Sequence, residues 1–256
     1  MPHIYISIVS HGNDDDIINN CNLNEINMLD NITVIVRDNL SSNRLKEYCL
    51  ANYFEYNASN IRLGFGSNNN INFQFATDLG MVETDWFILF NPDLDISAAM
   101  ISLLHDSLEN YSSQIFAINL YFDDQFSHME YSLRQYPTFS SFFNILKGKS
   151  FTQPYDKATL ANGSIVDWAA ASFLVFQVKL YKELNGFDEN YFMYYEDVDI
   201  CYRANKFFSQ NVVYLDNIKA IHQGAYQNRK IFSKHFKWYV SSLIRFLFKS
   251  SFGMKE

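Results

Sequence analysis

Apolar runs and helix-like stretches alternate through the first half of the chain, and this alternation is the feature that most restricts the fold. Such a rhythm predicts βαβ units around a mostly parallel sheet. The apolar runs are nearly continuous, which is typical of strands that helices cover on both faces. The runs are "IYISIV" (4–9), "ITVIVRDN" (32–39), "WFILF" (86–90) and "IFAINLY" (115–121), and the helix-like stretches lie near 41–52, 67–80 and 97–110.

The chain is long enough to bury one large core. It has 256 residues, of which 48% are hydrophobic, so disorder is not a serious option. After about residue 122 the rhythm gives way to an irregular aromatic segment that runs to about 163. Further strand-like and helix-like segments follow, which we interpret as an elaboration of the same domain. We therefore expect one domain at 1–228, with halves at 1–122 and 123–228, and a basic aromatic C-terminal helix at 229–256.

The three cysteines, Cys21, Cys49 and Cys201, lie far apart in the sequence. This spacing indicates neither a disulfide framework nor a thiolate metal site, so a reducing cytoplasm fits best. The opening "MPHIYISIV" has no Lys or Arg before its apolar run, and the run is too short for the core of a signal peptide. No uninterrupted apolar stretch approaches the length of a transmembrane helix. We expect a cytoplasmic protein that is soluble or peripheral.

The net charge of −8 is unevenly distributed. Residues 229–256 hold seven basic residues and one acidic residue, which leaves thirteen basic and twenty-seven acidic residues in the body. An acidic body lacks the basic groove that phosphate contacts need, so no nucleic-acid partner is expected. A basic aromatic helix can lie in a membrane interface and attract anionic lipid, and packing on the protein's own core is the alternative. Its apolar residues at helical spacing are Phe232, Phe236, Tyr239, Leu243 and Phe246.

Polar residues follow several of the expected strands, at the sheet edge where ligands of open α/β sheets bind. Asp38 and Asn39 end the second strand and can pair with a nucleobase, although an Asx turn is the alternative. The stretch "LGFGSNNN" at 63–70 places two glycines at the mouth of a helix, where backbone N–H groups can approach a phosphate or base. It lacks the third glycine and the acidic residue of a dinucleotide fingerprint, so a dehydrogenase is not favoured.

The stretch "FNPD" follows the strand at 86–90 and offers Asn91 and Asp93 on either side of a proline. Mg²⁺ and Mn²⁺ prefer oxygen ligands, which carboxylates and substrate phosphates share. The stretch therefore predicts a metal-bound diphosphate, and a strand that ends at Pro92 with Asp93 capping the next helix is the alternative. His222 follows another short strand, and its imidazole can complete such a site or be structural.

The stretch "YYEDVDICYR" crowds Glu196, Asp197 and Asp199 at the start of an apparent helix. The helix dipole favours acids in a first turn, and Asp199 can pair with Arg203 one turn later, so Asp199 has an ordinary explanation. Glu196 and Asp197 follow the aromatic run "GFDENYFMYY", which would press them against a hydrophobic wall. Burial raises the pKa of a carboxylate, and a carboxylate so placed can act as a general base.

Taken in order, these segments resemble glycosyltransferase family 2, a family of inverting enzymes with a GT-A fold, and within it the rhamnosyltransferase-like enzymes of bacterial O-antigen and polysaccharide assembly. The resemblance implies an α/β fold with a mostly parallel central sheet flanked by helices, of the Rossmann-like nucleotide-diphospho-sugar transferase type. It covers residues 4–222 and is carried by "SIVSHG", "VRDN", "GFGSNNN", "FNPD", "VDWAAASFLV", "GFDENYFMYYEDVDICYR" and "AIH".

The resemblance also implies roles for individual residues. Asn91 and Asp93 match the place of the family's metal-binding D-x-D motif, so it implies Mg²⁺ or Mn²⁺ at Asp93, with His222 as a further ligand. Asp197, with Glu196 beside it, matches the catalytic base. Asp167 and Trp168 match an acceptor-binding segment. The residues implied for the nucleotide sugar are Ser10, Asp38, Asn39, Gly64, Gly66, Asn69, Asn91 and Asp93.

The function that this resemblance implies is transfer of L-rhamnose from dTDP-L-rhamnose to a lipid-linked or growing surface polysaccharide, as in lipopolysaccharide O-antigen biosynthesis. Another UDP- or dTDP-sugar, or a catalytically silent nucleotide-sugar-binding scaffold, is the alternative. Where relatives usually have a glycine after the tryptophan, Ala170 and Ala171 narrow the space next to the expected acceptor. A lipid-linked acceptor would make peripheral attachment to the inner face of the plasma membrane useful.

Overall fold

The computed structural model describes residues 1–59, 61–138, 141, 151–222, 224 and 234–252. The first half contains the four strands expected from its apolar runs, β1 (Ile4–Ser10), β2 (Ile32–Asp38), β4 (Trp86–Phe90) and β6 (Ile115–Tyr121). Between them lie α1 (Asp14–Ile18), α2 (Cys21–Asn27), α3 (Asn43–Ala51), β3 (Glu55–Ala58), α4 (Phe65–Asp78), β5 (Leu94–Asp95) and α5 (Ala98–Leu108).

The second half adds short strands and further helices, of which α8 carries Glu196 and Asp197. The apolar run at 164–176 is divided among three strands that pair in different places, because its polar interruptions let the chain turn. The elements are β7 (Leu133–Arg134), a short 3-10 helix (Lys157–Thr159), β8 (Ser164–Val166), β9 (Trp168–Ala169), β10 (Phe173–Gln177), α7 (Val178–Glu183), α8 (Glu196–Phe208), β11 (Val212–His222) and α9 (Lys234–Phe252).

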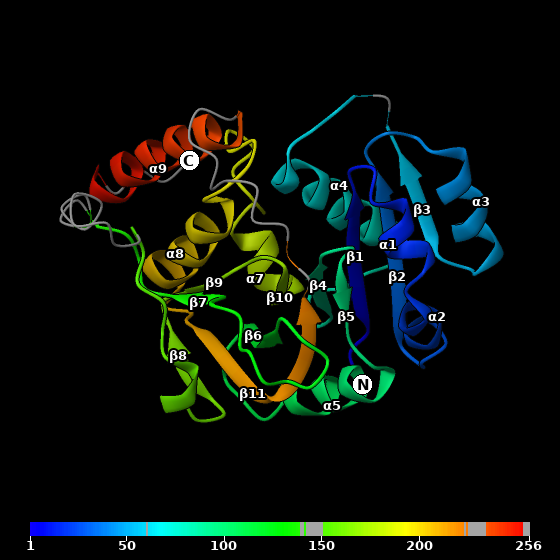
Figure 1. Cartoon of the computed structure of the whole chain (residues 1–256), viewed down its shortest axis with the longest axis horizontal. Coiled ribbons are helices and arrows are strands. Elements are labelled where there is room, and N and C mark those ends of the chain that lie inside the picture. The colour runs from blue at the N-terminus through cyan, green and yellow to red at the C-terminus, as the bar shows by residue number, and fades with distance from the viewer. Residues whose placement is uncertain (60, 139–140, 142–150, 223, 225–233, 253–256) are drawn as a thin grey trace.

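Among the described residues, the central sheet has nine strands in the order β3-β2-β1-β4-β10-β6-β11-β5, with β8 beside β11. β1, β2, β3 and β4 pair in parallel, whereas β10 runs antiparallel between β4 and β6. A strand of the second half thus completes the sheet of the first half, within one α/β unit (Figure 1). The domain boundaries at 122 and 228 stay predictions, and residue 228 lies outside the described residues.

Two hydrophobic cores cover the two faces of the sheet. Side chains alternate along β1, so that Ile4, Ile6 and Ile8 pack with the core beneath α1, α2, α3 and α5, whereas Tyr5 points to the core beneath α4, α7 and α8. The whole of β1 is buried as a result. Burial on both faces explains why the strands read as continuous apolar runs.

The pairing of the strands brings three distant segments to one edge. β1 and β4 run in parallel, so the loops that follow them emerge side by side. The end of β11 pairs with β5, which places His222 opposite Leu94 and therefore beside Asp93. The backbone N–H of Asn91 donates to the carbonyl oxygen of Ser172, just before β10, at 2.9 Å.

α9 packs against α8 and not away from the body (Figure 1). Leu243 and Phe246 are buried, and the Phe246 ring contacts Tyr202 of α8. These two side chains pack on the protein's own core, which was the alternative to a membrane contact. Phe232 lies outside the described residues. Within the part of the chain that the structure describes, no helix has the length and apolar character needed to span a bilayer.

Candidate active site

A cavity of about 630 Å³ opens where the loops after β1 and β4 meet the beginning of α8. One wall, which we call the donor-side wall because the sequence predicts the nucleotide sugar there, comes from the loop after β1 and the segment before α4. Its other wall comes from α8, the segment before α8 and the first turns of α9. The residues that line it include His11, Gly12, Asn13, Arg62, Leu63, Asn91, Asp93, Glu130, Ala170, Ala171, Phe192, Tyr194, Glu196, Asp197, His222, His235 and Trp238.

His222 joins two carboxylates at the sheet edge. Its Nε2 lies 3.3 Å from Asp93 Oδ1, and its Nδ1 lies 3.0 Å from Glu130 Oε2. Burial disfavours the charged imidazole, but hydrogen bonds and charge from both carboxylates outweigh it and raise the pKa of His222 to about 9. Burial likewise opposes ionisation of Asp93, and His222 outweighs it, so the pKa of Asp93 is lowered. The three side chains form one charged cluster that faces the cavity.

This cluster offers donors that fit a divalent cation shared with a substrate. Asp93 Oδ1 and His222 Nε2 lie 3.3 Å apart, and both are atom types that can ligate a divalent cation once the imidazole has lost the proton between them. Glu130 holds the other ring nitrogen of His222, as carboxylates behind metal-bound histidines do. The amide Nδ2 of Asn91 lies 3.5 Å from Nε2. Within the described residues no three His, Cys, Asp or Glu side chains converge on one point, so the protein offers a partial set.

Glu130 was not predicted from the sequence. It is 6% exposed and lines the cavity, yet it lies in an irregular segment with no motif around it. Only its position opposite the end of β11 identifies it.

Glu196 and Asp197 enter the cavity from a strained turn. Tyr194 and Tyr195, directly before them, both have left-handed backbone conformations, with φ of 71° and 66°. Bulky residues rarely adopt this conformation, and strain of this kind persists only where the surrounding structure enforces it. The turn brings both predicted catalytic acids to the lining of the cavity.

The two acids differ in their hydrogen bonds. Asp197 Oδ1 accepts a hydrogen bond from the backbone N–H of Val198 at 2.8 Å. Glu196 is buried, and its Oε2 has no hydrogen-bond partner among the described residues. Burial, and then the charge of Asp197, raises the pKa of Glu196, and burial raises the pKa of Asp197 to about 6. The pair therefore offers a carboxylate that can accept a proton near neutral pH.

Ser10 and Asn39 hold the donor-side wall from behind. Ser10 Oγ accepts hydrogen bonds from the backbone N–H groups of Gly12 and Asn13, both of which line the cavity. Asn39 donates to His11 Nδ1 at 2.8 Å and exchanges two hydrogen bonds with the backbone of Leu63. Their contacts shape the wall, while their own side chains are buried.

Asp38 is fully buried and lies outside the residues that line the cavity. Its carboxylate accepts hydrogen bonds from the backbone N–H groups of the next turn and from Tyr56. This geometry is that of the Asx-turn alternative. A contact of Asp38 with a nucleobase stays a prediction.

Gly64 and Gly66 lie where α4 packs closely against the segment before α8. A Cβ at Gly64 would meet the carbonyl oxygen of Phe192 at 2.3 Å, and a Cβ at Gly66 would meet Phe187 Cβ at 2.8 Å. Asn69 accepts a hydrogen bond from Ser7 at 2.7 Å inside the protein. The structure thus gives these residues a packing reason, and direct contacts with a nucleotide stay a prediction.

Asp167 and Trp168 are not brought to the cavity. Asp167 accepts hydrogen bonds from the backbone N–H of Tyr136 and the hydroxyl of Tyr155, and Trp168 Nε1 donates to the carbonyl oxygen of Gln135. They join β9 to the segments on either side of it. Their predicted role in acceptor binding is untested. By contrast, Ala170 and Ala171, which the sequence singled out, do line the cavity.

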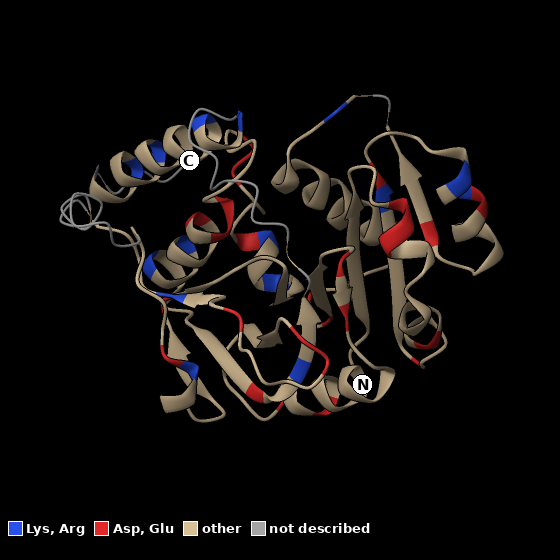
Figure 2. Ribbon diagram, viewed as in Figure 1, with Lys and Arg blue, Asp and Glu red and all other residues tan. Residues whose placement is uncertain are grey.

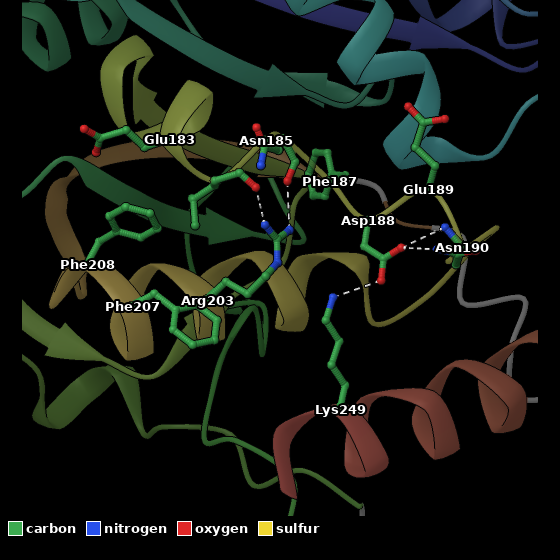
Figure 3. A pocket seen from close by; sticks show the side chains of 12 residues that line it. Glu183, Asn185, Phe187, Asp188, Glu189, Asn190, Arg203, Phe207, Phe208 and Lys249 are labelled. Carbon is green, nitrogen blue, oxygen red and sulfur yellow. Dashed lines mark hydrogen bonds and ion pairs between the residues drawn. The ribbon is translucent and has the colours of Figure 1, made fainter. Parts of the chain in front are cut away.

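Buried ion pairs tie α8, the segment before it and α9 together. Asp199 pairs with Arg203 at 2.6 Å, as its spacing predicted. Lys249 of α9 lies 3.0 Å from Asp188 and 3.1 Å from Asp199, and Arg245 lies 2.8 Å from Asp188. Figure 3 shows Lys249 reaching Asp188 beside a second hollow of about 440 Å³. Arg203 and Lys249, which line this hollow, are both paired with carboxylates. The hollow therefore marks a structural ion-pair cluster rather than a binding site.

Comparison with known proteins gives two curated relatives. The chain is 34% identical over 258 residues to the rhamnosyltransferase WbbL of Escherichia coli (strain K12), which covers 95% of this chain and 92% of the relative. It is 24% identical over 224 residues to the low-salt glycan biosynthesis hexosyltransferase Agl10 of Haloferax volcanii, which covers 87% of this chain and 68% of the relative. No family model matches the chain.

Solved structures share the fold. The mannosyltransferase PcManGT of Pyrobaculum calidifontis, in complex with GDP-Man and Mn²⁺, has a TM-score of 0.61 at 11% identity, over 100% of this chain and 65% of that one. GalNAc-T7 with UDP, GalNAc and Mn²⁺ has a TM-score of 0.62 at 11% identity, over 98% of this chain and 50% of that one. The chain thus spans two thirds or less of these structures. They confirm the predicted GT-A fold and, at this identity, the fold alone.

Proposed function

The chain belongs to glycosyltransferase family 2, among its rhamnosyltransferase-like enzymes, and from this membership we propose that it transfers L-rhamnose from dTDP-L-rhamnose to a lipid-linked or growing surface glycan. It is a glycosyltransferase that uses a nucleotide-sugar donor. One observation carries the proposal for its mechanism. The charged cluster at Asp93 and His222 and the acid pair Glu196 and Asp197 line the same cavity, so a donor diphosphate and an acceptor hydroxyl can meet between them.

Asp197 acts as the general base in the proposed reaction. It takes the proton of the acceptor hydroxyl while that oxygen attacks the anomeric carbon of the donor. The bond between the anomeric carbon and the diphosphate oxygen breaks on the opposite face, and the nucleoside diphosphate leaves with the bonding electrons. The configuration is inverted in this single displacement. The raised pKa of Glu196 favours its protonated form, so Glu196 adds no second negative charge beside Asp197.

The cluster at the sheet edge stabilises the leaving group. The amide Nδ2 of Asn91 can donate a hydrogen bond to the diphosphate, where negative charge develops. Asp93 and His222, with Asn91 beside them, would hold Mg²⁺ or Mn²⁺, which would neutralise charge on the diphosphate oxygens. Glu130 keeps the His222 ring in place.

The other predicted donor residues support the nucleotide indirectly in this proposal. Ser10 and Asn39 fix the backbone that lines the donor-side wall. The remaining ones, Asp38, Gly64, Gly66 and Asn69, hold β2 and α4 in position behind that wall. Asp167 and Trp168 support the acceptor side in the same way, by holding β9 just before Ala170 and Ala171.

A membrane-facing role for α9 is part of the proposal. Lys234, Lys237, Ile244 and Phe248 lie on its exposed face, and Figure 2 shows basic residues recurring along the helix. Each basic residue near an anionic surface contributes about 1 kcal/mol. We expect the double variant Lys234→Glu, Lys237→Glu to bind phosphatidylglycerol vesicles at least about tenfold more weakly in flotation assays. Equal binding to these vesicles by the variant would refute attachment to the inner face of the plasma membrane through this face.

A donor panel tests the proposed function. Thermal unfolding is measured with dTDP-, UDP- and GDP-sugars, each with and without Mg²⁺ or Mn²⁺, and transfer is followed by mass spectrometry. At 100-fold excess over Kd the true donor stabilises by about 2.7 kcal/mol. We expect dTDP-L-rhamnose with the metal to give the largest shift. A larger shift and turnover with another sugar would replace the donor, and binding without any turnover would favour a silent scaffold.

A further inference from the structure

We propose that Trp238 of α9 and Phe192 form a stacking platform for a sugar ring of the acceptor, in the cavity that Glu196 and Asp197 also line. This inference rests on the proposed glycosyl transfer and extends it to residues that no motif marks. It assigns a recognition role to the C-terminal helix in addition to any contact with a membrane.

The two rings lie together at the cavity. Their centroids are 4.8 Å apart with an interplanar angle of 43°, and both residues line the cavity together with Glu196 and Asp197. Phe192 is 37% exposed and Trp238 is half-buried, although both are large aromatic residues. Aromatic surface left partly open inside a concave site is typical of ligand contact, because pockets are lined by such rings with a few polar groups among them.

The platform suits the chemistry of a sugar. A pyranose ring has a face of C–H bonds, which packs on an aromatic ring, and a rim of hydroxyl groups, which needs hydrogen-bond partners. Polar groups of this kind lie around the platform. Tyr194 Oη is 3.0 Å from His235 Nδ1, and both residues line the cavity. An alkyl chain would gain from the rings but not from this polar rim.

The platform lies on the acceptor side because of the elements that carry it. The base that deprotonates the acceptor hydroxyl is at the start of α8, so the acceptor must lie against α8 and its neighbours. Phe192 precedes α8 in the same segment, and Trp238 comes from α9, which packs on α8. The diphosphate cluster comes from different elements, namely the ends of β4 and β11. The donor-side wall meets Phe192 through the start of α4, where the backbone N–H of Phe65 donates to the carbonyl oxygen of Phe192 at 3.3 Å.

Contacts along α9 fix the platform to the catalytic turn. Tyr239 meets the hydroxyl of Tyr195 at 3.2 Å, and Ser242 donates to the carbonyl oxygen of Met193 at 3.0 Å. The Lys249 pairs with Asp188 and Asp199 extend the same attachment to the far end of the helix. Trp238 therefore keeps one position relative to Glu196 and Asp197, and little ordering is needed when a sugar binds.

Sugar binding by the full chain tests the platform without requiring turnover. Saturation-transfer NMR is run with octyl glycosides of glucose, galactose, mannose and N-acetylglucosamine, below the concentrations at which they form micelles. We expect saturation of aromatic protons to reach the ring C–H protons of at least one probe. Trp238→Leu, which keeps an apolar side chain but removes the ring, should weaken that binding about tenfold, and Trp238→Phe should restore part of it.

The matched control is Tyr53→Leu, because Tyr53 is 87% exposed and lies outside the cavity lining. It should bind the probes like the wild type, and thermal unfolding checks that each variant is folded. Three NMR results would overturn the platform: saturation transfer that is unchanged in Trp238→Leu, saturation transfer to the octyl chain alone, or no saturation transfer to any probe. Failure of the proposed function gives a different result, since probe binding then persists while no donor is turned over.

Discussion

The two sides of the cavity are built in different ways. The side that we propose for the diphosphate consists of strand ends, where the pairing of β11 with β5 places His222 beside Asp93. The side that we propose for the acceptor consists of a strained turn at Tyr194 and Tyr195, which contacts α9. Strand ends position side chains through the sheet, whereas the turn depends on tertiary contacts alone. Substitutions on the first side should therefore lower the rate of transfer without unfolding the protein. Substitutions that weaken the second side should lower the stability of the fold.

Asp93→Asn should have the largest effect on the diphosphate side. It removes the only carboxylate of the "FNPD" stretch, and loss of one such electrostatic group costs about 10²–10³ in kcat. Glu130→Gln, which acts through His222, should cost about 10–100-fold. Steady-state kinetics of both variants measure this gradient. Asp95→Asn, an exposed neighbour, is the control, and equal losses in Asp93→Asn and Asp95→Asn would contradict the assignment.

Lys249→Met should lower the stability of the protein by weakening the attachment of α9 to α8 and the segment before it. It leaves Asp188 and Asp199 buried without one of their cations, and breaking a buried ion pair costs about 3 kcal/mol. Thermal unfolding should show Tm lowered by about 6–12 °C. Lys206→Met, on the exposed surface of α8, should change stability by less than about 0.5 kcal/mol. An unchanged Tm in Lys249→Met would mean that α9 does not hold the catalytic turn.

The pH dependence of the rate should report on Asp197. A base works only when it is deprotonated, and burial raises the pKa of Asp197 to about 6. The value of kcat/KM should therefore be constant above neutral pH and fall about tenfold for each unit below 6. Donor binding measured over the same range separates this loss from weaker binding. A rate that stays constant down to pH 5 would contradict the raised pKa.

Glu196→Gln should give the smallest effect and should stabilise the protein. The pKa of Glu196 is higher in the folded state than in the unfolded chain, so the folded state binds more protons. The free energy of unfolding therefore falls as the pH rises above the pKa that Glu196 has in the unfolded chain. Glutamine removes this loss. We expect a gain of about 1–2 kcal/mol at pH 8 and less at pH 5, measured by thermal unfolding. A variant that is less stable at pH 8 would show that the carboxylate makes favourable contacts.

The sequence predicted the strands of the first half, because buried strands leave continuous apolar runs, and it placed Asn91 and Asp93 at the end of β4. Their contact with a diphosphate stays a prediction. The sequence also located Glu196 and Asp197, since acids that follow a long aromatic run are unusual. It did not reveal that β10 completes the sheet between β4 and β6, because strand order depends on pairings across the whole chain. Trp238 was part of a basic aromatic tail, and only the packing of α9 on α8 places it at the cavity.

The reasons for some motif residues also needed the structure. Gly64 and Gly66 suggested close approach of a ligand, whereas the backbone of Phe192 and the side chain of Phe187 occupy the space beside them. A glycine in a sequence can indicate that another group lies close to its Cα, but the sequence does not show whether that group is a ligand or the protein itself. Glu130 left no signal, because a single acid in an irregular segment gains its role only when a strand from elsewhere brings His222 to it.

Asp197→Asn gives the most direct test of the account, which holds that one cavity binds a donor against Asp93 and His222 and activates an acceptor through Asp197. Donor affinity is measured by calorimetry, and transfer is measured with the same donor in a single turnover. The account predicts donor binding within about twofold of wild type and transfer slower by about 10²–10⁴-fold. Transfer at the wild-type rate would contradict it, as would loss of donor binding in proportion to the loss of rate.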